Sequence, residues 1–138
     1  MRHLLDNDVF FAAMYEKHVL HKQCRAWLDR AKPGGWAVAA ETYLAAVRLL
    51  MNPLVLRSGH LTGPEAVEAV EAELAGKHPG RVVIARSRPQ ADMLKRATGH
   101  KQVMDFWLVQ IASEHGCKLA TNDAALVAAW PDLVERIT

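Results

Sequence analysis

The apolar residues of this chain fall into two kinds of block, which predict strands and helices in alternation. Four short runs stay apolar at successive positions and are predicted as strands: "RHLLD", "WAVAA", "RVVIA" and "CKLATND". A strand without polar alternation is typical of a sheet that is buried on both faces. These four segments therefore predict the interior of a sheet.

Between the strands, apolar residues recur at helical spacing and are bounded by capping and breaker residues. The predicted helices cover residues 8–16, 18–31, 41–52, 63–77, 88–99, 102–116 and 124–131. Thr62 is a good N-cap, Pro53 stops the helix before it, and Gly99 is predicted to cap the end of the fifth helix. Short apolar strands separated by helices predict an α/β fold: a three-layer α/β/α sandwich with a mainly parallel sheet.

The composition is that of an ordinary globular protein. The chain has 138 residues, of which 51% are hydrophobic and 23% charged, so we expect one ordered domain over residues 1–138. A net charge of +2 is too small to indicate a nucleic-acid binder by itself.

The sequence also carries a prediction about the compartment. No apolar run approaches the roughly 18 residues that a membrane span requires, and "MRHLLDND" turns acidic where a signal peptide would still be apolar. Cys24 and Cys117 lie far apart, without CxxC spacing, and are expected to be reduced residues of the core. We therefore expect a cytoplasmic protein that does not associate with membranes.

Acidic residues follow three of the predicted strands. Asp6 ends the first, Glu41 follows the second and Asp123 follows "KLATN". In open parallel sheets, ligands bind beyond the carboxyl ends of the strands, near the point where the strand order reverses. A fourth acid, Asp105, has mostly apolar helical neighbours, and an ionised carboxylate in such surroundings is costly unless it is paired or metal-bound.

Each acid also has a purely structural interpretation. Asp6, Asp8 and Asp123 are suited to capping helices, because a carboxylate accepts hydrogen bonds from the free N–H groups of a first turn. Glu41 would interact favourably with a helix dipole, and Asp105 would be solvated if it lay on a polar stripe of its helix. From the residues alone, both interpretations stay open.

The chemical interpretation begins from charge. Carboxylates gathered against their mutual repulsion need a cation, and hard oxygen ligands favour Mg²⁺ or Mn²⁺. Such ions support phosphodiester hydrolysis. Receiver-type signalling domains also collect acids at strand ends, but they require a Lys at the end of a late strand, where this chain has "VVIA" and "LATN".

Several motifs carry a family resemblance. "HLLDNDVFFAA" has an apolar strand that ends in Asp with a polar residue two positions later, and "GHKQVMDFWLVQIASEHGCKLATND" has Gly-His, an Asp-bearing helix, "HG" and a strand ending in Thr-x-Asp. "HVLHKQCRAWL" and "VRLLMNP" supply His-x-x-His and Arg-x-x-x-Asn-Pro. In their order and spacing, these motifs resemble the PIN domain, and more closely the VapC toxins of bacterial toxin–antitoxin pairs, over nearly the whole chain.

The resemblance implies a PIN-like fold and a Mg²⁺- or Mn²⁺-dependent endoribonuclease. It implies Asp6, Asp105 and Asp123 as metal ligands and Thr121 as a residue that orients the site. It also implies an RNA substrate, with tRNA favoured, a homodimer, and a VapB-like antitoxin packed near the acids on a groove that Leu50, Met51 and Leu54 are expected to line.

Two departures from the family pattern concern the ligand set. The residue two positions after the first Asp is commonly Asn, Ser or Thr in the family, and here it is Asp8, which adds charge and is a candidate further ligand. Related sequences often read Thr-Glu where this chain has Thr42 and Tyr43. Glu41 lies two residues too early, and we predict that it still points into the site as a ligand and catalytic acid. If Tyr43 holds the position instead, the protein is a PIN-like binder of RNA or of a partner, without cleavage.

Two further groups of residues are candidates for ligand binding. His18, His21 and Cys24 are spaced by three, which is compatible with Zn²⁺ on one helix face, although RNA contacts or a surface position for the His residues and a core position for Cys24 are favoured. Basic residues near Asp105 predict either a phosphate-binding rim or a solvated face. The candidate substrate-binding residues are Thr121, His100, Lys101 and Arg96.

Overall fold

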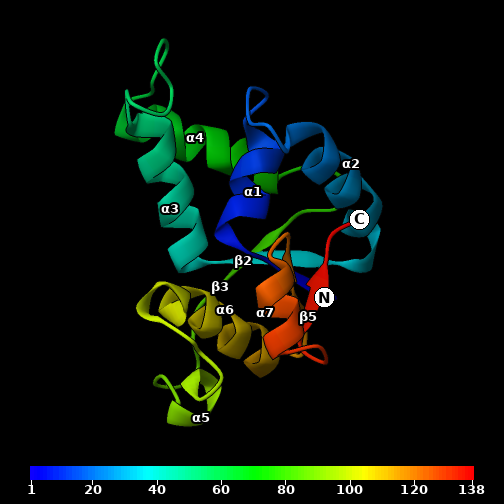
Figure 1. The fold of residues 1–138 in the computed structure, drawn as a ribbon. Coiled ribbons are helices and arrows are strands. Elements are labelled where there is room, and N and C mark those ends of the chain that lie inside the picture. Colours follow the sequence, from blue (N-terminus) through cyan, green and yellow to red (C-terminus); the bar gives the residue numbers. More distant parts are fainter.

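A five-stranded sheet runs through the centre of the computed structural model, which describes residues 1–138 (Figure 1). The strands are β1 (His3–Leu5), β2 (Trp36–Ala39), β3 (Arg81–Val83), β4 (Lys118–Thr121) and β5 (Val134–Arg136). Their order across the sheet is β3-β2-β1-β4-β5, and every neighbouring pair is parallel. The predicted mainly parallel sheet is confirmed, and it is parallel throughout.

Seven α-helices cover the two faces of this sheet (Figure 1). On one face lie α1 (Asn7–Met14), α2 (His21–Ala31), α3 (Ala40–Met51) and α4 (Gly63–Leu74). On the other lie α5 (Ala91–Leu94), α6 (Val103–Glu114) and α7 (Ala124–Ala129). Two 3-10 turns, η1 (Lys32–Gly34) and η2 (His100–Gln102), precede β2 and α6. The three-layer α/β/α sandwich is confirmed. No helix of this fold has the length and apolarity that crossing a membrane requires.

The apolar core is divided by the sheet into two clusters. Successive strand residues point to opposite faces, so Leu5 and Val38 pack with α1 to α4, whereas Leu4 and Ala37 pack with α6. All four side chains are fully buried. This explains why the central strands β1 and β2 have apolar residues at successive positions. Cys24 and Cys117 are free and buried, one in each cluster, as the sequence predicts.

The chain winds outward from β1 in both directions. It first forms β2 and β3 on one side of β1, then returns to form β4 and β5 on the other. The strand order therefore reverses between β1 and β4, and the loops that follow these two strands leave the same edge of the sheet. Whatever side chains stand at the ends of β1 and β4 are brought together there.

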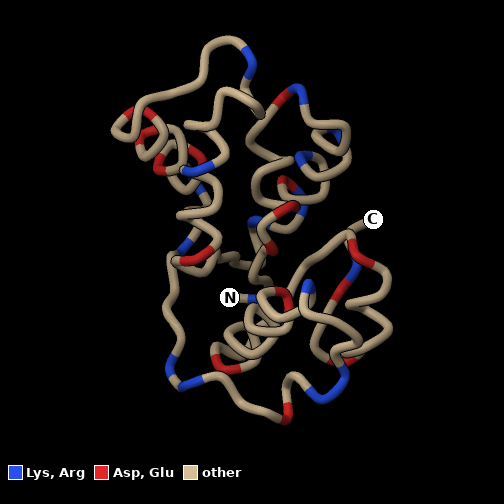
Figure 2. The backbone as a smooth tube through the Cα atoms, turned by 60° about the vertical axis from the view of Figure 1, so that its left-hand side comes forward, with Lys and Arg blue, Asp and Glu red and all other residues tan.

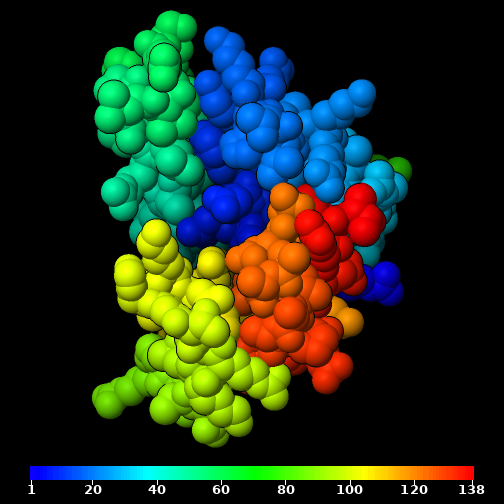
Figure 3. Space-filling model, in the orientation of Figure 1, coloured from blue at the N-terminus to red at the C-terminus, as the bar shows by residue number.

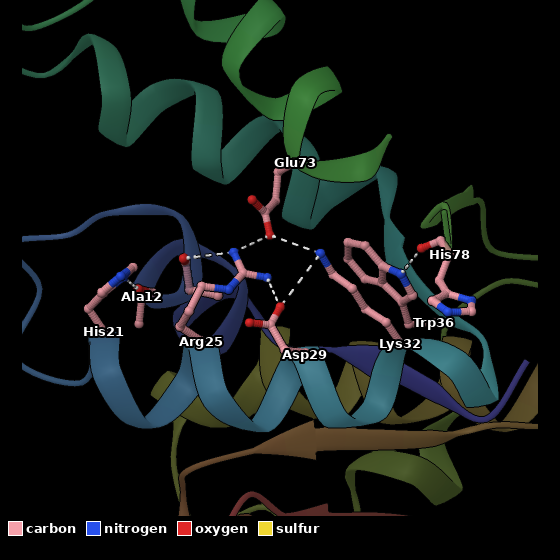
Figure 4. A network of polar contacts seen from close by, with 9 residues as sticks. Ala12, His21, Arg25, Asp29, Lys32, Trp36, Glu73 and His78 are labelled. Atoms are coloured by element: carbon pink, nitrogen blue, oxygen red, sulfur yellow. Dashed lines mark hydrogen bonds and ion pairs between the residues drawn. The ribbon is translucent and has the colours of Figure 1, made fainter. Parts of the chain in front are cut away.

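A polar network ties α1, α2 and α4 together on the upper face of the sheet (Figure 4). Arg25 of α2 donates to Glu73 of α4 at 2.6 Å, to the carbonyl of Ala13 at 3.2 Å and to Asp29 at 2.9 Å. Lys32 lies 3.7 Å from the same Glu73 carboxylate. Because Glu73 is half-buried, this pairing is less screened than an exposed ion pair.

The structure differs from the predicted elements in two places. β5 was not predicted, because "VER" has no apolar run and lies at the sheet edge with Val134 as its one fully buried residue. The helix predicted over residues 88–99 is reduced to the four residues of α5, and Gly99 is extended rather than left-handed. The segment before α5 is held instead by the buried side chain of Gln110, which accepts from the amide of Gln90 and donates to the carbonyl of Arg88.

Candidate active site

A cavity of about 230 Å³ opens at the edge of the sheet where β1 and β4 end. It is lined by Asp6, Asp8, Leu20, Asp105, Thr121, Asn122 and Asp123. Figure 3 is a view of the face on which the dark-blue start of the chain meets the yellow and orange regions of α6 and α7. Four of the lining residues are acids and none is basic. We refer to this space as the acid cavity.

Asp6 is the most buried of the four acids, and each of its two carboxylate oxygens accepts a hydrogen bond. It follows β1 directly, and its Oδ1 accepts from the amide of Val9 at 2.8 Å, which caps α1. Its other oxygen, Oδ2, accepts from the hydroxyl of Thr121, and that hydroxyl oxygen in turn accepts from the amide of Asp123 at 3.1 Å. Thr121 therefore joins the end of β1 to the end of β4 and fixes the Asp6 carboxylate.

The carboxylates destabilise one another's charge. Burial raises the pKa of Asp6 to about 6, and the nearby charges of Asp8 and Asp105 act in the same direction, against the hydrogen bonds from Thr121 and Val9. Burial also raises the pKa of Asp105, with further contributions from Asp123 and Asp8. Four acids that come from three distant segments thus interact within one cavity, and no basic residue lines it.

Two of the four acids cap helices and also line the acid cavity. Asp123 accepts from the amide of Ala125 at 2.9 Å and is the N-cap of α7, as Asp6 is of α1. Asp8 lies in the first turn of α1, is exposed, and makes no side-chain hydrogen bond. Asp105 is half-buried in the first turn of α6. Capping therefore accounts for two of the acids and leaves Asp8 and Asp105 without a capping role.

Glu41 is placed apart from these four acids. It lies in the first turn of α3, and its Oε2 accepts from the indole N–H of Trp107 on α6 rather than lining the acid cavity. Tyr43 is directed to α4, where its hydroxyl donates to Glu71 at 2.9 Å. Neither residue lines the cavity, although Glu41 contacts the helix that carries Asp105.

The three predicted basic contacts are also absent from the cavity lining. Arg96 is engaged elsewhere: its guanidinium lies 4.2 Å from the ring centroid of Trp130 and donates to the carbonyl of Ala129 at 2.8 Å. His100 and Lys101 are exposed on η2, just before α6. Figure 2 shows Lys and Arg spread along the chain, interspersed with Asp and Glu.

The residues considered for zinc are occupied in packing and local hydrogen bonds. The Nδ1 of His18 accepts from the amide of Leu20 at 3.0 Å, and the Nδ1 of His21 bonds the carbonyl of Ala12 at 2.8 Å. Cys24 is fully buried, and burial raises the pKa of its thiol to about 11. This arrangement agrees with the core position predicted for Cys24.

The donor set of the acid cavity fits a hard divalent cation in its chemistry. All its charged groups are carboxylates, which are the ligands preferred by Mg²⁺ and Mn²⁺, and no protein cation offsets them. As they stand, no three His, Cys, Asp or Glu side chains are close enough together to hold a metal ion. Like charges repel, so without a cation between them these carboxylates are expected to stand apart.

Two polar residues beside the cavity were missed by the sequence analysis. Asn7 lies between the two acids of "DND", and its Oδ1 accepts from the hydroxyl of Thr42 at 2.6 Å. Thr42 is fully buried at the start of α3. The sequence signal for this contact is Thr42 itself, which matches the Thr of the family's Thr-Glu pair.

Comparison with known proteins gives consistent matches along most of the chain. The PIN domain family matches residues 4–129. Ribonuclease VapC39 of Mycobacterium tuberculosis (strain ATCC 25618 / H37Rv) is 31% identical over 140 aligned positions that cover 98% of this chain and 99% of the relative. Ribonuclease VapC41 of the same strain is 32% identical over 88% of this chain and 89% of its own length. Ribonuclease VapC29 is 28% identical over 94% and 92%.

Proposed function

The chain belongs to the PIN domain family, and from that premise we propose that it is a VapC-like toxin that hydrolyses RNA phosphodiester bonds with Mg²⁺ or Mn²⁺. The observation that carries this proposal is the acid cavity: four carboxylates from three distant segments line one cavity at the strand reversal, with no basic residue in the lining. The relatives named as ribonucleases match over nearly their whole lengths, which supports the same chemistry here.

In this proposal, Asp6, Asp105 and Asp123 hold the cation, and Asp8 is a further ligand. When bound, the cation would supply Lewis-acid stabilisation of the phosphate and of the leaving oxygen, and would lower the pKa of the attacking water. Thr121 keeps the Asp6 carboxylate in one orientation by donating to it. The low exposure of Asp6 limits competition from water for its oxygens.

Glu41, which the sequence suggests as a fifth acid, enters the proposal differently. Its carboxylate accepts from Trp107, two residues after Asp105 on α6. We propose that this bond fixes the start of α3 against α6 and so helps to position Asp105. The direct ligand role predicted from the sequence stays a prediction, which the Glu41 variant described in the Discussion tests.

The proposed partners follow the same family. We propose inhibition by a VapB-like antitoxin and action as a homodimer, with structured RNA such as tRNA as the substrate. Met51 at the end of α3 and Leu54 in the turn that follows are exposed, Leu54 by 84%, and offer apolar surface to such a partner. Leu50, which was expected to line the same groove, is buried in the core against α1 and α4 and does not contribute to that surface.

A second candidate function has one observation in its favour. Tyr43 stands where the family often has Glu and is bonded to Glu71 instead of facing the acids. If the remaining acids are too few, the protein binds RNA or a partner without cutting. The two functions predict opposite outcomes in a cleavage assay.

The test is digestion of total RNA by the purified protein with Mg²⁺, Mn²⁺ or EDTA. The Asp105→Asn variant keeps the size of the side chain and removes its charge, and Asp92→Asn, at an exposed acid of α5, is the matched control. We expect discrete fragments that require metal, loss of cleavage by at least about a hundredfold for Asp105→Asn, and wild-type activity for Asp92→Asn. Intact RNA with correctly folded wild-type protein would favour binding without cleavage.

A further inference from the structure

A second hollow lies directly beside the acid cavity. It has a volume of about 310 Å³ and is lined by Asn7, Asp8, Ala45, Arg48, Leu49 and Asn52. Asp8 lines both spaces, so the two hollows meet at this residue. The second hollow, which we call the Arg48 pocket, lies between the first turn of α1 and the outer half of α3, two helices that run side by side (Figure 1).

Besides the Asp8 carboxylate that it shares with the acid cavity, the Arg48 pocket is lined by three side chains with hydrogen-bond donors that no protein group accepts. Arg48 is exposed in the last turn of α3 and makes no hydrogen bond or ion pair within the protein. The Oδ1 of Asn52 accepts from the amide of Leu54 at 2.9 Å, and the Oδ1 of Asn7 accepts from Thr42. The acceptor end of each carboxamide is therefore engaged, and each amino group is left without a protein partner.

We propose that the Arg48 pocket binds the nucleotide next to the scissile phosphate, with the guanidinium of Arg48 on its phosphate group. This inference rests on the proposed function, because it assumes that RNA is cut at the acid cavity. A nucleic-acid strand carries a phosphate at every nucleotide, and the Arg48 pocket adjoins the acid cavity at Asp8, so a strand cut at the carboxylates can place its next phosphate in this pocket. Arg48 is the basic residue in the lining of this pocket.

The chemistry of the pocket favours a nucleotide. Guanidinium groups bind phosphate oxygens in a bidentate manner, and these charge-assisted hydrogen bonds are among the strong ones. The carboxamide amino groups of Asn7 and Asn52 suit the acceptor atoms of a base or sugar. A volume of about 310 Å³ is at the lower end of the roughly 300–1,000 Å³ found for small-molecule sites, which fits one nucleotide.

The position of Arg48 also explains how an acidic site attracts an anion. The four carboxylates repel RNA before a cation is bound, and Arg48 on the far side of Asp8 supplies attraction at the entrance without standing in the acid cavity. Asp8, between the two hollows, separates a cation-binding space from an anion-binding one. Arg48 would therefore contribute to substrate binding and not to the metal site.

The test compares Arg48→Gln with Arg81→Gln. Arg81 is also exposed and unpaired. It begins β3 and so lies at the amino end of a strand, whereas the acid cavity lies at the carboxyl ends of β1 and β4. Binding of a labelled mixed-sequence RNA oligonucleotide is measured with Mg²⁺ in the Asp105→Asn background, which leaves the RNA intact, over about 50 to 300 mM KCl. Cleavage of total RNA is measured with each Arg variant in the wild-type background.

We expect Arg48→Gln to weaken RNA binding by about 10- to 100-fold and to lower the slope of log affinity against log salt by about 0.7, the value for one phosphate contact in a single strand. Cleavage at low RNA concentration should fall by a similar factor. Arg48→Lys should keep the salt slope and recover part of the affinity, because Lys retains the charge but not the bidentate geometry. Arg81→Gln should match the unsubstituted protein in the binding and cleavage assays.

Two results would overturn the inference, and they can be told apart. If the wild type cleaves RNA but Arg48→Gln binds and cleaves as Arg81→Gln does, the Arg48 pocket holds no nucleotide, while the nuclease proposal stands. If the wild type neither binds nor cleaves RNA, the proposed function fails and the pocket assignment fails with it.

Discussion

Without a bound cation, ionisation of Asp6 should measurably lower the free energy of unfolding of the protein. Burial raises the pKa of this carboxyl from its ordinary 3.8 to about 6. At about 1.4 kcal/mol per pH unit, that difference corresponds to about 3 kcal/mol of stability between strongly acidic and neutral pH. Asp6→Asn removes the charge while keeping an oxygen that can cap α1, because Asn is as good an N-cap as Asp.

The direction of the pH dependence follows from proton binding. Because the folded state binds the proton on Asp6 more tightly than the unfolded state, the stabilisation is fully present below about pH 4 and is lost as the pH rises through about 6. The wild-type protein should therefore lose stability across this range, and Asp6→Asn should not lose that portion. Burial also raises the pKa of Asp105, so the stability of both proteins should fall further as the pH rises, and by the same amount in each.

The assay is urea unfolding in EDTA at pH 4.5 and at pH 8. We compare the unfolding free energy of Asp6→Asn with that of the wild type at each pH. The value for the variant relative to the wild type should be about 2 kcal/mol higher at pH 8 than at pH 4.5. Asp92→Asn, at an exposed acid, should show no shift. At pH 8, Mg²⁺ should stabilise the wild type and not Asp6→Asn, by about 2.7 kcal/mol at a hundred times its Kd. An equal difference at both pH values would refute the reasoning.

Two further variants test other contacts. Arg25→Met should destabilise the protein by about 1–3 kcal/mol in urea unfolding, because it leaves the half-buried Glu73 carboxylate and the Ala13 carbonyl without their donor; Arg57→Met, at an exposed and unpaired Arg, should cost less than about 0.5 kcal/mol. Glu41→Gln should reduce RNA cleavage by less than about tenfold, because Gln can still accept from Trp107, whereas a loss as large as that of Asp105→Asn would establish Glu41 as a ligand.

The layered fold was predictable because its signal is local. The central strands have apolar residues at successive positions, and the core clusters on the two faces of the sheet explain that pattern, as Leu4 and Leu5 show by packing on opposite faces. β5 was missed because an edge strand with one buried residue carries no such pattern. The segment before α6 was misjudged because Gln110, a residue 20 positions later in the sequence, decides the path of the chain at Gln90.

The sequence could predict mainly those site residues whose place is determined by the end of a strand. Asp6 and Asp123 follow adjacent parallel strands, and the rule for open sheets therefore brings them together. Asp105 was found from the cost of an acid among apolar neighbours. The direction of the Glu41 side chain could not be deduced, because it depends on an indole 66 residues away on another helix. The sequence shows Arg48 only as part of a motif, because its proximity to Asp8 depends on how α3 packs against α1.

The same carboxylates that begin helices also create the charge of the acid cavity, and this dual use has a consequence for stability. A cap needs one oxygen of Asp6, and the bond to Val9 satisfies that need. The second oxygen is held by Thr121 at the strand reversal, where Asp8 and Asp105 raise the cost of the charge. A sequence selected only for stability would gain by placing Asn or Ser at this position. Retaining an acid there, at about 3 kcal/mol near neutral pH, is understandable if a cation offsets the cost, which is why the stability of this protein and its proposed chemistry should respond to the same ion.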